Sequence, residues 1–188
     1  MIKGNGRESL LPKYFILYMI LSFFGWLWET MYMYFLTGYL HDRGFLTLPF
    51  CPIYATVLLG AYFLLGTISQ GRGILKGVKS SVARALIYLC LSFILPTLAE
   101  LIFGAFFDKV LNISLWDYSF MEFNTGGYIA LEISVLWAAA IFIFMNKFFI
   151  PLKKLIFKIP EKIGYIISIA LVLAVSIDLG LILIKLSI

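Results

Sequence analysis

Five long runs of apolar residues, separated by short polar or basic connections, dominate this sequence. They cover 14–37, 53–69, 83–107, 128–150 and 163–186, and the second is the shortest. A helix needs about 20 mainly apolar residues to cross the hydrocarbon core of a bilayer. Only 13% of the residues are charged, against about 25% in soluble domains, so lipid must cover much of the surface. Because open sheets cannot survive in lipid, we predict an all-α, polytopic helical membrane protein with about five transmembrane helices.

The basic residues are distributed unevenly over the connections. They gather in the N-terminal tail, 1–13, and in the segments 70–82 and 151–162, and they are sparse in 38–52 and 108–127. Positively charged connections stay on the cytoplasmic side. We therefore predict one transmembrane domain, 1–188, with a cytoplasmic N-terminus, two basic cytoplasmic segments and two outer loops that are partly re-entrant. The net charge of +5 is then a topology signal, and we expect no nucleic-acid partner.

Four acidic residues lie inside these apolar runs, each in a different run. Counted from the outer helix ends, they share a layer about 8–14 Å below the outer surface, at 1.5 Å per residue. Ionisable residues inside a membrane are rare and usually face the bundle interior or a wet cavity. The four are Glu29, Glu100, Glu132 and Asp178. They predict an acidic polar cavity that opens outward, or alternatively a hydrogen-bonded polar core that fixes helix register.

Helical spacing indicates which way two of these acids face. In the first run, Tyr18, Ser22, Gly25, Glu29 and Tyr32 recur at steps of three and four, and in the third run, Ser92, Pro96, Glu100 and Gly104 recur every four residues. Small and polar stripes of this kind pack against neighbouring helices. Arg43, in the first outer loop, is a plausible partner for Glu29 or Glu100, because a buried acid without a partner is costly.

Three segments carry a resemblance to a known family. The segments "SFFGWLWET", "DRGFLTLPFCPIYATVLLG" and "LWDYSFMEFNTGGYIALEISVLWA" resemble the motifs of the ABC-transporter type IV family, the CmpB-like bacterial integral membrane proteins. The resemblance spans 22–140 and implies a permease-like protein of the bacterial inner membrane. The chain departs from the family pattern at Ala55, where a glycine is usual, and at Tyr128, where an arginine often stands. Together with the acidic layer, the motifs give these candidate binding residues: Glu29, Arg43, Tyr54, Glu100, Asp117, Asn124, Glu132 and Asp178.

The chain carries no motif for ATP hydrolysis. A P-loop needs G-x-x-x-x-G-K-[ST], and the nearest segment, "GRGILKGVKSS" at 71–81, has the wrong spacing. We expect a separate ATPase subunit if ATP drives transport. The basic stretch 150–163 reads as a short amphipathic helix that binds anionic lipid through Lys153, Lys154 and Lys158, with docking of the ATPase as the alternative.

The sequence gives little support for an enzymatic function. Metalloprotease and serine-hydrolase motifs are absent, so we expect no metal and no cofactor, and an enzyme is the less favoured reading. We predict a transporter or permease-like subunit with an acidic, outward-facing cavity for a small solute or cation. The alternatives are a membrane-embedded enzyme acting on lipid or cell-envelope substrates, and a non-transporting assembly or sensor subunit. The small size favours a subunit of a larger complex or a homo-oligomer.

Overall fold

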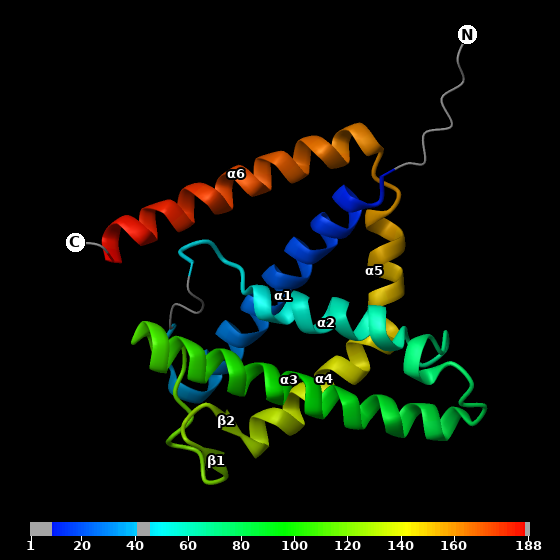
Figure 1. Ribbon diagram of the computed structural model, residues 1–188, viewed down its shortest axis with the longest axis horizontal. Coiled ribbons are helices and arrows are strands. Elements are labelled where there is room, and N and C mark those ends of the chain that lie inside the picture. The colour runs from blue at the N-terminus through cyan, green and yellow to red at the C-terminus, as the bar shows by residue number, and fades with distance from the viewer. Residues whose placement is uncertain (1–8, 41–45, 187–188) are drawn as a thin grey trace.

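A computed structural model describes residues 9–40 and 46–186 (Figure 1). The described residues are mainly helical, as predicted, with one short β-hairpin before the fourth long helix. The helices are α1 (Leu11–Thr37), α2 (Pro52–Leu65), α3 (Ser81–Leu111), α4 (Leu131–Lys147), α5 (Phe149–Ile156) and α6 (Glu161–Leu186), with a 3-10 turn at Gly73–Leu75. The hairpin pairs β1 (Asn124–Thr125) with β2 (Ile129–Ala130) in antiparallel register.

Three of the described helices, α1, α3 and α6, are long and apolar enough to cross a membrane, and α4 with α5 makes a fourth candidate if the bent pair is one span. The multi-pass helical class predicted from the sequence is therefore confirmed, whereas the count of five is not. The difference lies in the second and fourth apolar runs.

The second run forms a helix that is too short to span a bilayer alone. At 1.5 Å per residue, the 14 residues of α2 reach about 21 Å, against about 30 Å of hydrocarbon. Pro52 begins the helix, and Gly66 ends it with a φ of 74° that favours glycine. The N–H of Cys51 donates to the carbonyl of Ser22 in the middle of α1 (3.1 Å). The connection that follows α1 thus returns to the middle of that helix at Cys51, which is the path expected of a re-entrant loop; that assignment stays a prediction.

The fourth run forms a bent pair of helices. Helices α4 and α5 meet at Phe148 with a bend of 54°. Pro151 explains the break, because proline has no N–H to donate to the carbonyl of Lys147 and its ring clashes with that carbonyl. The predicted run 128–150 therefore ends its straight part at Lys147, and the next eight residues form the short helix predicted within the basic stretch.

The helices pack as two antiparallel pairs. Helix α2 packs on α1 and α3 packs on α4, while contacts between the pairs are fewer, and α6 packs against α1. Figure 1 shows the start of α1, the end of α2, the start of α3, α5 and the start of α6 gathered at one end of the molecule. The hairpin and the ends of α3 and α6 lie at the opposite end.

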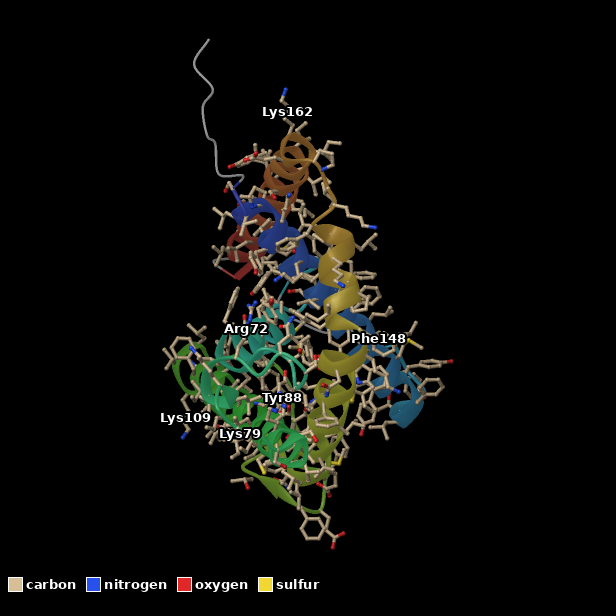
Figure 2. The ribbon with its side chains drawn as sticks, turned by 90° about the vertical axis from the view of Figure 1, so that its right-hand side faces the viewer. Arg72, Lys79, Tyr88, Lys109, Phe148 and Lys162 are labelled. Atoms are coloured by element: carbon tan, nitrogen blue, oxygen red, sulfur yellow. The ribbon has the colours of Figure 1, made fainter. Side chains whose placement is uncertain are left out.

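The first of these ends is the basic end, as the uneven charge distribution requires. Figure 2 looks at the molecule from this side, with Arg72 and Lys79 on the connection after α2 and Lys162 at the start of α6. Which end faces the cytoplasm stays a prediction from the positive-inside rule.

Two buried clusters hold the pairs together and leave a space between them. The larger cluster joins α1, α2, α4 and α5 around Leu17, Tyr62, Met145 and Phe149. The smaller one lies toward the hairpin, around Trp137 and Tyr118. Many large apolar side chains on the helices are exposed. In α6, only 6% of the most apolar stretch of 18 residues is buried. Such a surface needs lipid or another apolar partner to cover it.

Candidate binding cavity between the two helix pairs

A cavity of about 780 Å³ lies between the α1/α2 pair and the α3/α4 pair. Its walls are mostly aliphatic and aromatic, and they come from all four helices and from the loops that precede α2 and α4. Small-molecule sites are typically of this size and lining, with a few well-placed polar groups. Glu29 and Glu100 are both among the lining residues, so the structure brings these two predicted acids together.

Glu29 reaches the cavity from α1 and is held by a tyrosine of α2. The hydroxyl of Tyr54 donates a hydrogen bond to Glu29 Oε2 at 2.7 Å. The ring of Tyr54 lies so close to Gly25, one turn before Glu29, that a Cβ at position 25 would collide with it. The predicted small and polar stripe of α1 therefore faces α2, where Tyr18 also bonds to Thr56 (3.1 Å).

Glu100 reaches the cavity from α3. The buried residues of that helix recur every four positions: Tyr88, Ser92, Pro96, Glu100 and Gly104. The predicted stripe is thus the buried face of α3. Glu100 is only 9% exposed, and its Oε2 has no hydrogen-bond partner among the described residues. A buried polar atom without a partner costs on the order of 1–3 kcal/mol, so it needs an explanation.

Trp137 of α4 places the N–H group of its indole ring near the Glu100 carboxyl. Its indole N–H is close enough to interact with the Glu100 carboxyl, yet Trp137 Nε1 completes no hydrogen bond of standard geometry with any described residue. The Trp137 ring also packs on the Tyr54 ring, with centroids 5.1 Å apart at 60°. Two aromatic rings and two carboxyl groups therefore meet in one wall region of the cavity.

The loop before α4 lines the cavity, at the end away from the basic end, with two more aromatic side chains, Trp116 and Tyr118. The indole N–H of Trp116 donates to the carbonyl of Tyr128 at 2.8 Å. The backbone N–H of Tyr118 donates to the carbonyl of Gly127 at 2.9 Å. These bonds tie the loop to the hairpin, so both rings are positioned by structure and are not simply anchors at the membrane surface.

Two carboxyl side chains line the cavity among the described residues. Glu29 and Glu100 are its only charged lining residues within 9–40 and 46–186. Arg43, the predicted partner of these acids, lies outside the described residues. No group of three or more metal-type side chains lies together in the described part of the chain.

Two of the predicted acids lie away from the cavity. Glu132 is the second residue of α4 and is exposed; its carboxylate accepts a long hydrogen bond from the N–H of Phe123 (3.4 Å). Asp178 of α6 is buried, at 8% exposed, and it accepts a hydrogen bond from the N–H of Leu48 at 3.0 Å. It therefore fastens the loop before α2 to α6. The shared depth of the four acids did not bring them into one site, because depth says nothing about lateral position.

Asp117 and Asn124 belong to the hairpin and not to the cavity. Asp117 Oδ1 accepts the N–H of Ser119 (2.8 Å), and the Ser119 side chain and backbone together hold the pKa of Asp117 below its usual value. Asn124 donates to the carbonyl of Met121 (2.7 Å) and accepts from the N–H of Gly127 (3.2 Å). Both side chains therefore build the turn of this loop, whereas the sequence analysis listed them as candidate binding residues.

At the basic end, Lys153 of α5 is enclosed by aromatic rings. Its Nζ lies 4.5, 5.2 and 5.0 Å from the ring centroids of Tyr62, Tyr14 and Phe157. It also donates to the Tyr62 hydroxyl at 2.6 Å. The sequence placed Lys153 with Lys154 and Lys158 at the lipid surface; Lys153 instead fastens α5 to α1 and α2, while the other two are exposed.

Sequence reasoning missed Trp137 and Cys51 as cavity residues. Trp137 continues a buried row at steps of four, Ile133, Trp137, Ile141 and Met145, and that periodicity could have placed it. Cys51 lines the cavity, but only the hydrogen bond to Ser22 puts it at that depth. Both cysteines of the chain are free thiols.

Comparison with known proteins identifies one family. No curated protein and no solved structure gives a significant match. The sequence model of one family, described as "Putative ABC-transporter type IV", matches residues 16–183. The match covers all six helices at least in part and confirms the resemblance found in the motifs. The chain therefore belongs to the ABC-transporter type IV, CmpB-like family.

Proposed function

We propose that this chain is a transporter or permease-like subunit whose acidic, outward-opening cavity binds a small solute or cation. The family and the apolar helices support a transporter-like membrane protein. The cavity between the helix pairs supports the finer part of the proposal, because it is of ligand size and brings Glu29 and Glu100 together from different helices.

The observation that carries the proposal is the buried carboxyl oxygen of Glu100, which has no hydrogen-bond partner among the described residues. If the acids only fixed helix register, each buried carboxyl oxygen should have a partner within the fold. Glu29 is bonded to Tyr54 and fits that alternative. Glu100 Oε2 does not, since it is buried beside the cavity without a partner among the described residues. A ligand with a positive or donating group would supply one.

The energy source would be a separate ATPase subunit docked at the basic end. The sequence has no P-loop of its own. Helix α5 and the connection after α2 lie together at that end (Figure 1). Lys154 and Lys158 are exposed there, and they are available to an ATPase or to anionic lipid. A second copy of the chain on the exposed face of α6 would be a further element of the assembly.

Cys51 provides a direct test of an acidic cavity that opens outward. A Cys90→Ser chain keeps Cys51 as its only thiol. Intact cells would be treated with two impermeant methanethiosulfonates, one bearing a trimethylammonium group and one bearing a sulfonate. One unit charge a few Å away contributes on the order of 1 kcal/mol even at the dielectric constant of water. We therefore expect the cationic reagent to react about fivefold faster or more, after normalisation to a free thiol.

The charge preference should depend on the two cavity acids. Glu29→Gln and Glu100→Gln should each lower the ratio of the two rates, whereas Glu132→Gln, an acid outside the cavity, should leave it unchanged. The ratio cancels changes in the intrinsic reactivity of the thiol. No labelling from outside, or a ratio equal to that of a free thiol, would overturn the proposal.

A further inference from the structure

We infer that the ligand of this cavity is an organic ammonium ion that carries an apolar body. The inference rests on the proposed function and narrows it to one chemical class. Three properties of the cavity support it: the charge of its polar groups, the aromatic rings beside them and the apolar remainder of its walls.

The charge selects a cation. Glu29 and Glu100 are the only charged side chains among the described lining residues. The unpartnered Oε2 of Glu100 needs a donor or a positive charge, and an ammonium group supplies both. An anionic ligand would add a like charge to this region at a cost.

The aromatic rings select an organic cation. The rings of Tyr54 and Trp137 pack at 5.1 Å from each other in the wall that contains the acids. Cations that lie over aromatic faces within about 6 Å of the ring centroid are attracted by the ring quadrupole, and quaternary ammonium groups are recognised in this way. The same chain already encloses an ammonium group with rings, since Lys153 Nζ lies 4.5 Å from the Tyr62 centroid.

A bare metal ion fits the cavity poorly. Hard cations such as Ca²⁺ take six to eight oxygen ligands, and Mg²⁺ takes six. Only two carboxyl groups line this space among the described residues, and no metal-type cluster of three is present in that part of the chain. A hydrated ion would also have to lie against aliphatic and aromatic walls.

The apolar walls accommodate a hydrocarbon body beside the charged group. The cavity of about 780 Å³ is far larger than one ammonium group. Phe24, Phe103 and Phe148 line it and are each between 42% and 55% exposed. The cavity therefore reaches the apolar surface of the protein, and the body of the ligand can extend from the acids toward the lipid.

The experiment measures protection of Cys51 by defined probes. The Cys90→Ser chain is placed in nanodiscs of phosphatidylglycerol, and Cys51 is modified with the neutral reagent N-ethylmaleimide. The probes are hexyltrimethylammonium, tetramethylammonium and hexanesulfonate. We expect hexyltrimethylammonium to protect Cys51 at a concentration about tenfold lower than tetramethylammonium, which corresponds to about 1.4 kcal/mol. Hexanesulfonate should not protect.

Matched variants separate binding from partition into the bilayer. Glu100→Gln should raise the protecting concentration of hexyltrimethylammonium about tenfold, and Glu132→Gln should leave it unchanged. In a Cys51→Ser chain, the probe should not slow modification of Cys90, which is exposed on α3. Equal slowing of Cys51 and Cys90 would mean that the probe acts through the bilayer, and it would overturn the inference.

A lipid headgroup is the second source of the same chemistry. If phosphatidylethanolamine in the nanodisc slows modification of Cys51 without added probe, and Glu100→Gln removes this effect, the ammonium group comes from the lipid and the inference stands. If phosphatidylethanolamine has no effect while hexyltrimethylammonium protects, the ligand is a free amphiphilic amine.

The remaining outcomes distinguish the inference from the proposed function. Equal protection by tetramethylammonium would refute the apolar body and leave a cation site. Protection by hexanesulfonate, or by no probe at all, would refute the ammonium class, while the charge preference of Cys51 labelling would still support an acidic cavity. Loss of that charge preference as well would remove the proposed function itself.

Discussion

Two regions of this molecule treat a charged group beside aromatic rings in opposite ways. At the basic end, Lys153 is covered by three aromatic rings and bonded to the Tyr62 hydroxyl at 2.6 Å. Between the helix pairs, Glu100 is buried beside aromatic rings, but its Oε2 has no partner among the described residues. The contacts of Lys153 are complete, as expected of a structural residue. The Glu100 oxygen lacks a hydrogen-bond partner, as expected of a residue in a binding site.

Structural charges differ from functional ones in this fold by the contacts that surround them. In both regions a charged side chain lies beside aromatic rings. What differs is whether the fold itself completes the contacts. A substitution at the completed site should therefore lower stability, whereas a substitution at the incomplete site should change binding and leave stability nearly intact.

The largest loss of stability is expected from a substitution of Lys153. Lys153→Met keeps the length of the side chain but removes the charge and the donor to Tyr62. Loss of a charge-assisted hydrogen bond and of cation–π contacts should lower the free energy of unfolding by about 2–4 kcal/mol. Thermal unfolding in detergent would measure it. Lys154→Met, at the exposed neighbouring position, is the control and should change little; equal effects of the two changes would mean that the aromatic enclosure contributes nothing.

A smaller effect is expected where α1 meets Tyr54. Gly25→Ala places a methyl group against the Tyr54 ring, which should cost about 1–3 kcal/mol and displace the hydroxyl from Glu29. Gly60→Ala on α2 meets no atom within 4 Å and should be neutral or stabilising, because alanine favours the helix. Unfolding of both variants in detergent would measure the difference. Equal stability of the two variants would show that α1 and α2 do not pack this closely.

The smallest effect is expected at Asp117, in the loop before α4. Its pKa is held below the usual value by Ser119. A carboxyl with a lowered folded pKa stabilises the fold above its unfolded pKa, of about 4, and this contribution is lost as the pH falls through the folded pKa. Protection of the Ser119 amide against hydrogen exchange should therefore decrease in acid. Asp117→Asn should show no such pH step; a step that persists in this variant would assign it to another group.

The sequence predicted the faces of the helices better than their lengths. The stripe Ser92, Pro96, Glu100 and Gly104 could be placed because one helix face repeats every three to four residues, and all four residues are buried. The length of α2 depends on Pro52 and Gly66, which interrupt an apolar run without changing its composition. The bend at Phe148 likewise depends on a single residue, Pro151.

The site was predicted only in part, for a physical reason. Counting residues along a helix gives the depth of a side chain but not its neighbours, so Glu132 and Asp178 appeared equivalent to Glu29 and Glu100. Tyr54 was placed by a motif, and its bond to Glu29 agrees with that placement. The enclosure of Lys153 could not be foreseen, because it joins α5 to rings from α1 and α2 that are distant in the sequence.

The most direct test of the central claim is the melting temperature of the wild-type chain and the Glu100→Gln variant in nanodiscs, each with and without hexyltrimethylammonium. A ligand that binds only the folded state stabilises it by about 1.4 kcal/mol at ten times its Kd. We expect the cation to raise the melting temperature of the wild type. The variant should melt at the same temperature or higher without ligand, and the cation should shift it far less. A variant that is strongly destabilised, together with no shift of the wild type by the cation, would contradict the account and make Glu100 a structural residue.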